Sequence, residues 1–114
     1  MKKVYICSPL KGDIEKNKTK ALIYCRFAYE KGCNPFAPHV YYTQFLEDEI
    51  EQERTDGMRM GLEWMWAFQE IWVFGSFITT GMAKEIELAK LLGIKVRYFN
   101  SDFDEVNLYG KYIR

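Results

Sequence analysis

The sequence predicts a three-layer α/β fold with a parallel sheet of about four to five strands. Short apolar runs rich in β-branched and aromatic residues alternate with longer segments in which apolar residues recur at helical spacing. Small residues such as Gly, Pro and Ser follow the apolar runs, at the points where strands turn into helices. The length of 114 residues is typical of one domain, so we expect residues 1–114 to form a single one.

The first segments predict a strand, a turn and a helix. Val4–Cys7 is a continuous apolar run, as in a buried parallel strand, and Pro9–Asp13 is typical of a turn. Asp13 is a candidate N-cap for a helix over Ile14–Lys31, because its side chain can accept from the amides of the first turn. Gly32 ends that helix.

The next segments are less regular. Cys33–Ala37 predicts a second strand, although Pro35 cannot donate a ladder hydrogen bond. Residues 39–46 are aromatic and irregular. The acidic run over residues 47–53 indicates a solvated loop or helix end.

The second half repeats the alternation more clearly. Helices are expected over Asp56–Gln69 and Gly81–Leu92, and strands over Ile71–Phe74 and Ile94–Phe99. The pattern of residues 100–114 is weak and suggests packing on a neighbouring subunit. Because alternating strands and helices build a parallel sheet with right-handed crossovers, the expected architecture is Rossmann-like or flavodoxin-like.

Composition narrows the classes of partner. Sixteen basic residues balance sixteen acidic ones, and the basic residues are scattered, which argues against a nucleic-acid polymer or an anionic membrane surface as partner. Three widely spaced cysteines and one histidine predict neither a disulfide framework nor a metal site. Reduced thiols and the absence of a long apolar segment favour a cytoplasmic protein without a membrane span.

Aromatic residues make up 17% of the chain, which is more than a small core can bury. Some of them are therefore expected to line a pocket or an interface, and the small size favours a homo-oligomer.

The most informative stretch runs from Phe74 to Ala89, where a predicted strand is followed by a loop and then by a helix that begins at Gly81. Backbone amides and hydroxyls at a helix start can hold an anion. Thr79 or Thr80 could donate to a phosphate, and the plainer alternative is that one of them caps the helix.

Glu85 lies one turn into this helix and can point into a cleft above the sheet. A partly buried carboxylate there could attack the anomeric carbon of a sugar. The alternative is a favourable interaction with the helix dipole. Glu87 lies on the opposite side of the helix and is expected to face solvent.

Other candidate residues surround the same edge of the sheet. Ser8–Asp13 has the same order of strand end, small residues and helix start. His39 follows Pro38 at the end of the second predicted strand, beside Tyr41 and Tyr42, which could stack on a base or cover a dimer contact.

Proton donors for a leaving base are harder to place. Asp56 and Glu63 share a helix face and could serve if that helix reaches the cleft. A solvated helix face is the stronger interpretation of both.

Two segments carry a family resemblance. Gly81–Ala89 and Val4–Pro9 resemble the nucleoside 2-deoxyribosyltransferase-like superfamily, which includes transferases and nucleoside 5′-monophosphate glycosidases. The pattern from Val4 to Phe99 is most similar to the bacterial and phage branch called DUF4406 or DUF7768.

The resemblance implies roles for individual residues. Glu85 matches the nucleophile, Tyr5 matches the tyrosine that contacts it, and Thr79 matches a phosphate-binding Ser of the monophosphate glycosidases. Residues 8–12 match their first phosphate and sugar loop. Loop 76–80 lacks the carboxylates that the transferases usually carry there, which leaves the general acid unassigned.

The sequence and the resemblance together predict an N-glycosidase or deoxyribosyltransferase that binds a nucleoside or nucleotide without a cofactor, with its pocket near a subunit interface. The alternative is a catalytically silent protein that binds a nucleotide or an ADP-ribose-derived signal. A third hypothesis is a structural or partner-binding domain that merely retains the fold. The candidate catalytic residues are Glu85 and Tyr5, and the candidate ligand contacts are Ser8, Pro9, Leu10, Gly12, Asp13, His39, Gly75, Ser76, Thr79, Thr80, Gly81 and Met82.

Overall fold

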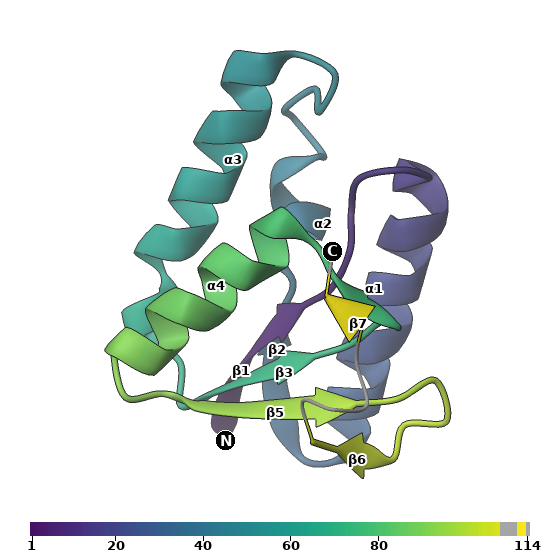
Figure 1. Ribbon diagram of the computed structural model, residues 1–114, viewed down its shortest axis with the longest axis vertical. Coiled ribbons are helices and arrows are strands. Elements are labelled where there is room, and N and C mark those ends of the chain that lie inside the picture. The colour runs from purple at the N-terminus through teal and green to yellow at the C-terminus, as the bar shows by residue number, and fades with distance from the viewer. Residues whose placement is uncertain (108–111, 114) are drawn as a thin grey trace.

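A five-stranded sheet in the order β2-β1-β3-β5-β6 forms the centre of the molecule (Figure 1). The computed structural model describes residues 1–107 and 112–113. The strands of this sheet are β1 (Lys2–Cys7), β2 (Cys33–Phe36), β3 (Glu70–Val73), β5 (Lys95–Phe99) and β6 (Glu105–Val106). The first four are parallel and β6 is antiparallel to β5, so the predicted parallel sheet is confirmed and gains an antiparallel edge.

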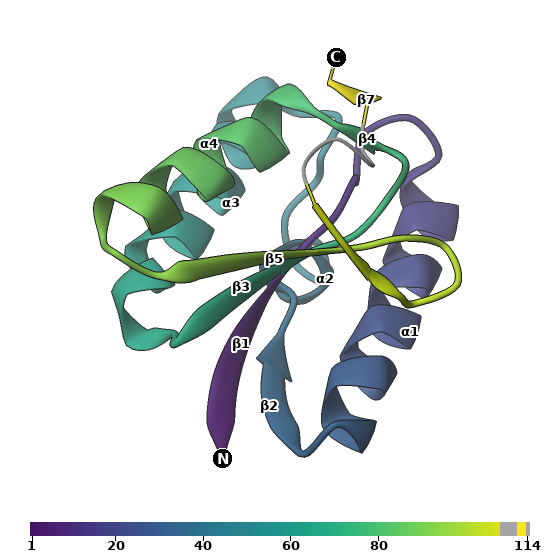
Figure 2. The ribbon, with the colours of Figure 1, turned by 60° about the horizontal axis from the view of Figure 1, so that its bottom comes forward.

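Helices cover both faces of this sheet. They are α1 (Ile14–Glu30), α2 (Pro38–Tyr42), α3 (Glu51–Glu63) and α4 (Thr80–Leu91), with a 3₁₀ turn η1 (Met65–Ala67). Figure 2 shows α1 on one side of the sheet and α3 and α4 on the other, which confirms the three layers. Two short strands, β4 (Phe77–Ile78) and β7 (Tyr112–Ile113), pair with each other away from the main sheet.

Alternate residues of each central strand enter different cores. On β1, Tyr5 and Cys7 pack toward α4, whereas Val4 and Ile6 pack toward α1. The α1 side is an aromatic cluster in which Phe74 stacks on Tyr24 with ring centroids 4.3 Å apart. The α4 side holds the residues that continue into the site.

The strand order reverses between two particular strands. The chain leaves β1 toward β2 on one side and reaches β3 on the other, so the order reverses between β1 and β3. In such sheets the loops after the two strands diverge and leave a crevice at their carboxyl ends. This edge holds Ser8 and the start of α4.

The proline inside β2 is tolerated because β2 lies at the edge of the sheet. Pro35 is in β2, which pairs only with β1 in this sheet. The missing N–H therefore removes no bond to a second neighbour.

Two helices differ from the sequence-based expectation. The aromatic segment predicted as irregular contains the short helix α2, which begins at Pro38, a residue whose fixed φ suits the first turn. Helix α3 begins five residues before the expected Asp56, because Glu51 and Glu53 of the acidic run occupy its first turn, where the helix dipole favours carboxylates. It ends at Glu63 rather than Gln69, where η1 follows.

The tail was expected to pack on a neighbour. Residues 100–114 contribute β6 and β7. Residues 108–111 and 114, on which part of that expectation depends, lie outside the described residues. Among the described helices, none combines the length and the apolar character needed to cross a membrane.

Candidate active site

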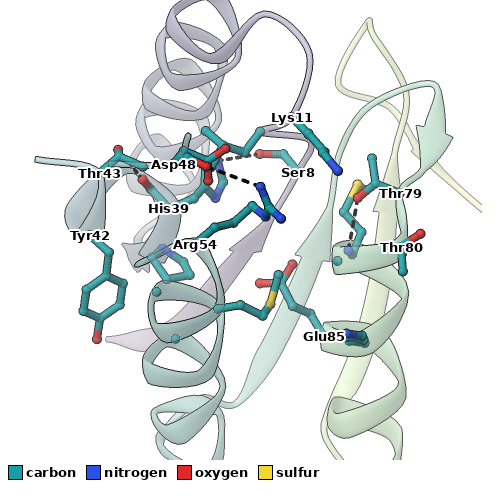
Figure 3. A pocket seen from close by; sticks show the side chains of 18 of the residues that line it. Ser8, Lys11, His39, Tyr42, Thr43, Asp48, Arg54, Thr79, Thr80 and Glu85 are labelled. Atoms are coloured by element: carbon teal, nitrogen blue, oxygen red, sulfur yellow. Dashed lines mark hydrogen bonds between the residues drawn. The ribbon is translucent and has the colours of Figure 1, made fainter. Parts of the chain in front are cut away.

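A cleft of about 570 Å³ opens at the carboxyl ends of β1 and β3, within the size range of pockets for small ligands. Its walls come from the loop after β1, from α2 and α3, and from the first two turns of α4. Figure 3 shows the labelled side chains of these elements around one space.

Nine of the fourteen residues predicted from the sequence line this cleft. They are Tyr5, Ser8, Leu10, His39, Thr79, Thr80, Gly81, Met82 and Glu85. Segments that are distant in the sequence therefore meet as the strand order requires.

The other five do not line it: Pro9, Gly12, Asp13, Gly75 and Ser76. Asp13 caps α1, where its Oδ1 accepts from the amide of Lys16 at 3.2 Å. Gly75 has φ +104°, and a Cβ there would come within 3.0 Å of Pro9 Cδ. These two residues thus allow the loops after β3 and β1 to pack closely.

Glu85 lies at the buried end of the cleft. It is only 6% exposed, and its helix buries Met82, Ile86 and Ala89 on the same face against the sheet. Its Oε1 lies 3.5 Å from Cys7 Sγ, and its carboxyl also hydrogen bonds with Tyr5. Burial raises the pKa of Glu85 to about 7, although the hydrogen bonds from Tyr5 and Cys7 oppose that rise. Glu87 is exposed, as expected.

Tyr5 is buried beside the carboxyl group of Glu85. Its ring is fully buried and meets Phe68 edge to face at 5.5 Å. Burial and then the charge of Glu85 raise the pKa of Tyr5 well above its ordinary value, so the phenol stays protonated and donates. The Tyr5 contact implied by the resemblance is thus present in the free chain.

The start of α4 is capped by its own side chain. Thr79 Oγ1 accepts from the amide of Met82 at 3.2 Å, which favours the capping interpretation over the phosphate one for that oxygen. Thr80 is exposed to the cleft. A Cβ at Gly81 would come within 2.7 Å of Met58 Cε, so the glycine lets α3 and α4 approach.

His39 and Ser8 face each other across the rim. Ser8 Oγ lies 3.3 Å from His39 Nε2. Burial lowers the pKa of His39 to about 4, so the imidazole is neutral near pH 7. It is therefore a neutral hydrogen-bonding partner of Ser8 and not a cation.

The aromatic neighbours of His39 have separate surroundings. Tyr42 lines the cleft, and its hydroxyl accepts from Trp64 Nε1 at 3.1 Å. Tyr41 is exposed and meets Phe45 edge to face. Tyr42 therefore lines the cleft, and Tyr41 does not.

Three cations line the cleft, namely Lys84 of α4, Arg54 and Lys11, and none was among the candidate ligand contacts, although Lys11 lies within the predicted loop 8–12. Arg54 of α3 hydrogen bonds to the carbonyl of Asp48 at 3.5 Å, and Lys11 extends from the loop after β1 (Figure 3). Neither forms an ion pair within residues 1–107 and 112–113. Glu53-Arg54 is part of the segment that resembles the family, but no role was predicted for Arg54, because an Arg in an acidic segment is typical of a solvated helix.

The two carboxylates named as candidate proton donors lie outside the cleft. Asp56 and Glu63 do not line the cleft, and Asp56 is engaged by Arg59 at 3.2 Å. Besides Glu85, the carboxylates that line it are Asp48 and Glu53, and Glu53 Oε1 accepts from the amide of Glu47 at 2.9 Å.

Comparisons with known proteins agree with this fold. The model of the DUF7768 family, described as a domain of unknown function, matches residues 2–99. The solved structure of a 2-deoxyribosyltransferase from Bacillus psychrosaccharolyticus is 23% identical, with a TM-score of 0.63 over 94% of this chain and 78% of that one. A 2-deoxyribosyltransferase from Leishmania mexicana is 16% identical, with a TM-score of 0.60 over 100% of this chain and 83% of that one. No curated protein matches the sequence. At these identities the two structures establish the Rossmann-like fold of the chain.

Proposed function

Since this chain belongs to the DUF7768 family, a domain of unknown function, we propose its activity from the cleft itself. It binds a nucleoside or nucleotide and cleaves or transfers at the N-glycosidic bond, with Glu85 as the nucleophile. The observation that carries the proposal is a buried carboxylate facing a cleft of ligand size, with Tyr5 and Cys7 hydrogen bonded to it. The fold shared with two 2-deoxyribosyltransferases supports the same reaction class.

The proposed step begins with ionised Glu85. One carboxylate oxygen attacks C1′ of the sugar, the C1′–O bond forms, and the C1′–N bond breaks with its electron pair leaving on the base. The base takes up a proton, and water or a second base then attacks C1′ and releases Glu85. A pKa near 7 leaves a large fraction of Glu85 ionised at neutral pH, while burial keeps the carboxylate poorly solvated and reactive.

The opposite side of the cleft suits an anionic part of the ligand. Arg54 and Lys11 bring two positive charges without a carboxylate partner among the described residues, and Ser8 adds a hydroxyl. Guanidinium and ammonium groups recognise phosphate. We therefore place a phosphate, when the ligand carries one, beside Arg54 and Lys11.

The proton for the leaving base is assigned to Asp48. It lines the cleft, and no hydrogen bond or ion pair of its carboxyl group is found within residues 1–107 and 112–113, unlike that of Glu53. Asp56 and Glu63 lie elsewhere and are not retained in this role.

The alternative function is binding without turnover. Loop 76–80 carries no carboxylate, and this departure from the transferases favours a protein that holds a nucleotide or an ADP-ribose-derived signal. Such a protein would use the same cleft, with Glu85 as a ligand contact.

Further expectations from the sequence and the resemblance belong to the same proposal. They are a homo-oligomer with the cleft near a subunit interface, a cytoplasmic location, and a kinship with DUF4406. The exposed side chains of Tyr41, Phe45 and Trp64, which lie on or next to α2 and α3, are candidates for such an interface.

Mass spectrometry separates the two functions. The purified protein is incubated with a panel of nucleosides and nucleotides, and both products and retained ligands are read. Release of free base that disappears in Glu85→Gln, but not in the matched exposed variant Glu87→Gln, supports the enzyme. Ligand recovered intact on denaturation, with no base released from any member of the panel, supports the binding protein and removes the nucleophile role.

A further inference from the structure

We propose that Cys7 is a positioning residue for Glu85, a role that goes beyond the function proposed above. Its thiol donates to the ionised carboxylate, and it turns to the backbone carbonyl of Met82 when Glu85 becomes neutral or covalently occupied. The catalytic consequence rests on the proposed function, whereas the hydrogen-bond switch itself does not.

The geometry around Cys7 offers one proton and two acceptors. Cys7 is fully buried at the end of β1, two residues after Tyr5, so both side chains point toward α4. Its Sγ lies 3.5 Å from Glu85 Oε1 and 3.9 Å from the carbonyl oxygen of Met82. Met82 precedes Glu85 by three residues, so both acceptors lie on one side of α4.

Cys7 does not act as a nucleophile here. It is absent from the residues that line the cleft. Burial and then the charge of Glu85 raise the pKa of Cys7 well above its ordinary value, so it carries a proton throughout the working range. It therefore acts on the reaction through Glu85, and not by contact with the ligand.

A thiol suits this position because it is a weak donor. A hydrogen bond to the charged form of Glu85 opposes the desolvation that raises its pKa. When the carboxylate loses its charge by bonding to C1′, a weak donor is released at small cost. The carbonyl of Met82 then accepts the hydrogen bond from the thiol, so that no buried donor is left unsatisfied.

The other ionisable groups near this pair come from the sheet and from the elements that line the cleft. They are Tyr5 on β1, Tyr98 on β5, His39 on α2, Asp48 before α3, Glu53 and Arg54 on α3, Lys84 on α4, and Lys11 after β1. Burial and the neighbouring Cys7 raise the pKa of Tyr98, and the pKa of His39 is about 4. Glu85 is hydrogen bonded to the Cys7 thiol and its pKa is about 7, so a titration near pH 7 that is sensed at this thiol is assigned to Glu85.

The hydrogen-bond switch can be tested first with Cys7 and Glu85 both unchanged, through the infrared S–H stretching band of Cys7. The variant Cys25→Ala/Cys33→Ala removes the two thiols on the α1 side and leaves the band of Cys7. We expect this band to shift between low and high pH with the same midpoint as the carboxyl band of Glu85. A band that stays constant across the titration of Glu85 would overturn the proposal, whatever the catalytic activity.

The second test changes the donor. The carboxyl ¹³C signal of Glu85, assigned with Glu85→Gln, is titrated by NMR in Cys7→Ala, in Cys7→Ser and in the control Cys25→Ala. Removing a donor to the charged form should raise the pKa of Glu85 by about 0.5 to 1 pH unit. Cys7→Ser should hold it at or below the wild-type value, and Cys25→Ala should leave it unchanged.

The outcomes separate this inference from the proposed function. If N-glycosidic turnover exists, the acid limb of kcat/KM should move with the NMR titration in each variant. A shifted titration without any turnover would keep the switch and reject the enzyme. An unshifted titration in folded Cys7→Ala, with turnover intact, would reject the switch and keep the enzyme.

Discussion

Gly61 of α3 faces the hydroxyl of Tyr5 so closely that a Cβ on the glycine would come within 3.2 Å of that oxygen. The same Cβ would meet Pro38 Cβ at 3.0 Å. Tyr5 is part of β1 and hydrogen bonds with Glu85, so α3 packs directly on the group that donates to the candidate nucleophile. The missing side chain at Gly61 leaves room for that phenol.

Gly61→Ala should therefore disturb the site before it disturbs the fold. The added methyl must displace either Tyr5 or Pro38, and a phenol shifted by a few tenths of an ångström loses its hydrogen bond to Glu85. We expect turnover, or ligand affinity for a binding protein, to fall by roughly tenfold or more. The measurement is steady-state kinetics, or isothermal titration if no turnover is found.

Gly57→Ala is the matched control on the same helix. Its Cβ would meet Leu46 at 3.6 Å and Tyr42 at 3.8 Å, which are ordinary contacts. It should raise the free energy of unfolding by about 0.5 to 1 kcal/mol, because alanine is the better helix former. Equal behaviour of the two variants would contradict the role given to Gly61.

The stability of the protein should depend on pH through two opposing groups. The pKa of Glu85 rises from 4.5 to about 7 on folding, so the folded state holds its proton in that range and stability falls as pH rises from 4.5 to 7. The pKa of His39 falls from 6.5 to about 4, so stability from that residue rises with pH between 4 and 6.5. The two slopes partly cancel in the wild type.

Single substitutions should uncover each slope in urea unfolding at a series of pH values. Relative to the wild type, Glu85→Gln should gain stability above pH 7, by up to about 3 kcal/mol for a shift from 4.5 to about 7. His39→Gln should leave a profile that falls more steeply between pH 4.5 and 6.5. Glu87→Gln, which is exposed on the same helix as Glu85, should follow the wild-type curve.

The cap of α4 makes a separate prediction. Thr79→Ala leaves the amide of Met82 without its side-chain acceptor, which should lower the free energy of unfolding by about 1 kcal/mol. Thr79→Ser should restore most of this loss, because it keeps the oxygen. Thr80→Ala, one residue later and exposed, is the control, and an equal loss there in thermal or urea unfolding would argue against the cap.

The sequence predicted the sheet and the part of the site that lies on α4, because both depend on local patterns. Val4–Cys7 is apolar throughout since both faces of β1 are covered, and Gly81 and Glu85 follow from a strand that empties into a helix. Glu85 was also identified by its match to a family segment, and the structure adds its burial and its contact with Cys7. That contact joins residues 78 positions apart, and no local pattern contains it.

Other parts of the site depend on packing that the sequence does not display. Helix α3 reaches the cleft because Gly61 lets it approach α2 and β1, so Arg54 lines the cleft and Asp56 does not. Pro9 and Gly75, two of the candidate ligand contacts, lie against each other and do not line the cleft. The sequence alone does not distinguish a glycine that permits close packing from a glycine that contacts a ligand.

The last prediction concerns the charge at Arg54. It lines the cleft with Lys11 and forms no ion pair in the described part of the chain, so its charge is available to a ligand. Arg54→Gln should weaken binding of a nucleoside 5′-monophosphate by roughly 10- to 100-fold, the loss expected for one charge-assisted contact. It should leave the corresponding nucleoside nearly unaffected.

Glu85→Gln is the background of choice for that measurement, because it prevents turnover under the proposed mechanism while keeping the cleft. Arg59→Gln is the matched control, since Arg59 lies on the same helix, is exposed and pairs with Asp56 at 3.2 Å. Titration calorimetry at two salt concentrations adds an independent check, because the advantage of the monophosphate over the nucleoside should shrink as salt screens Arg54. Equal losses for both ligands in Arg54→Gln would instead place Arg54 against the sugar or the base.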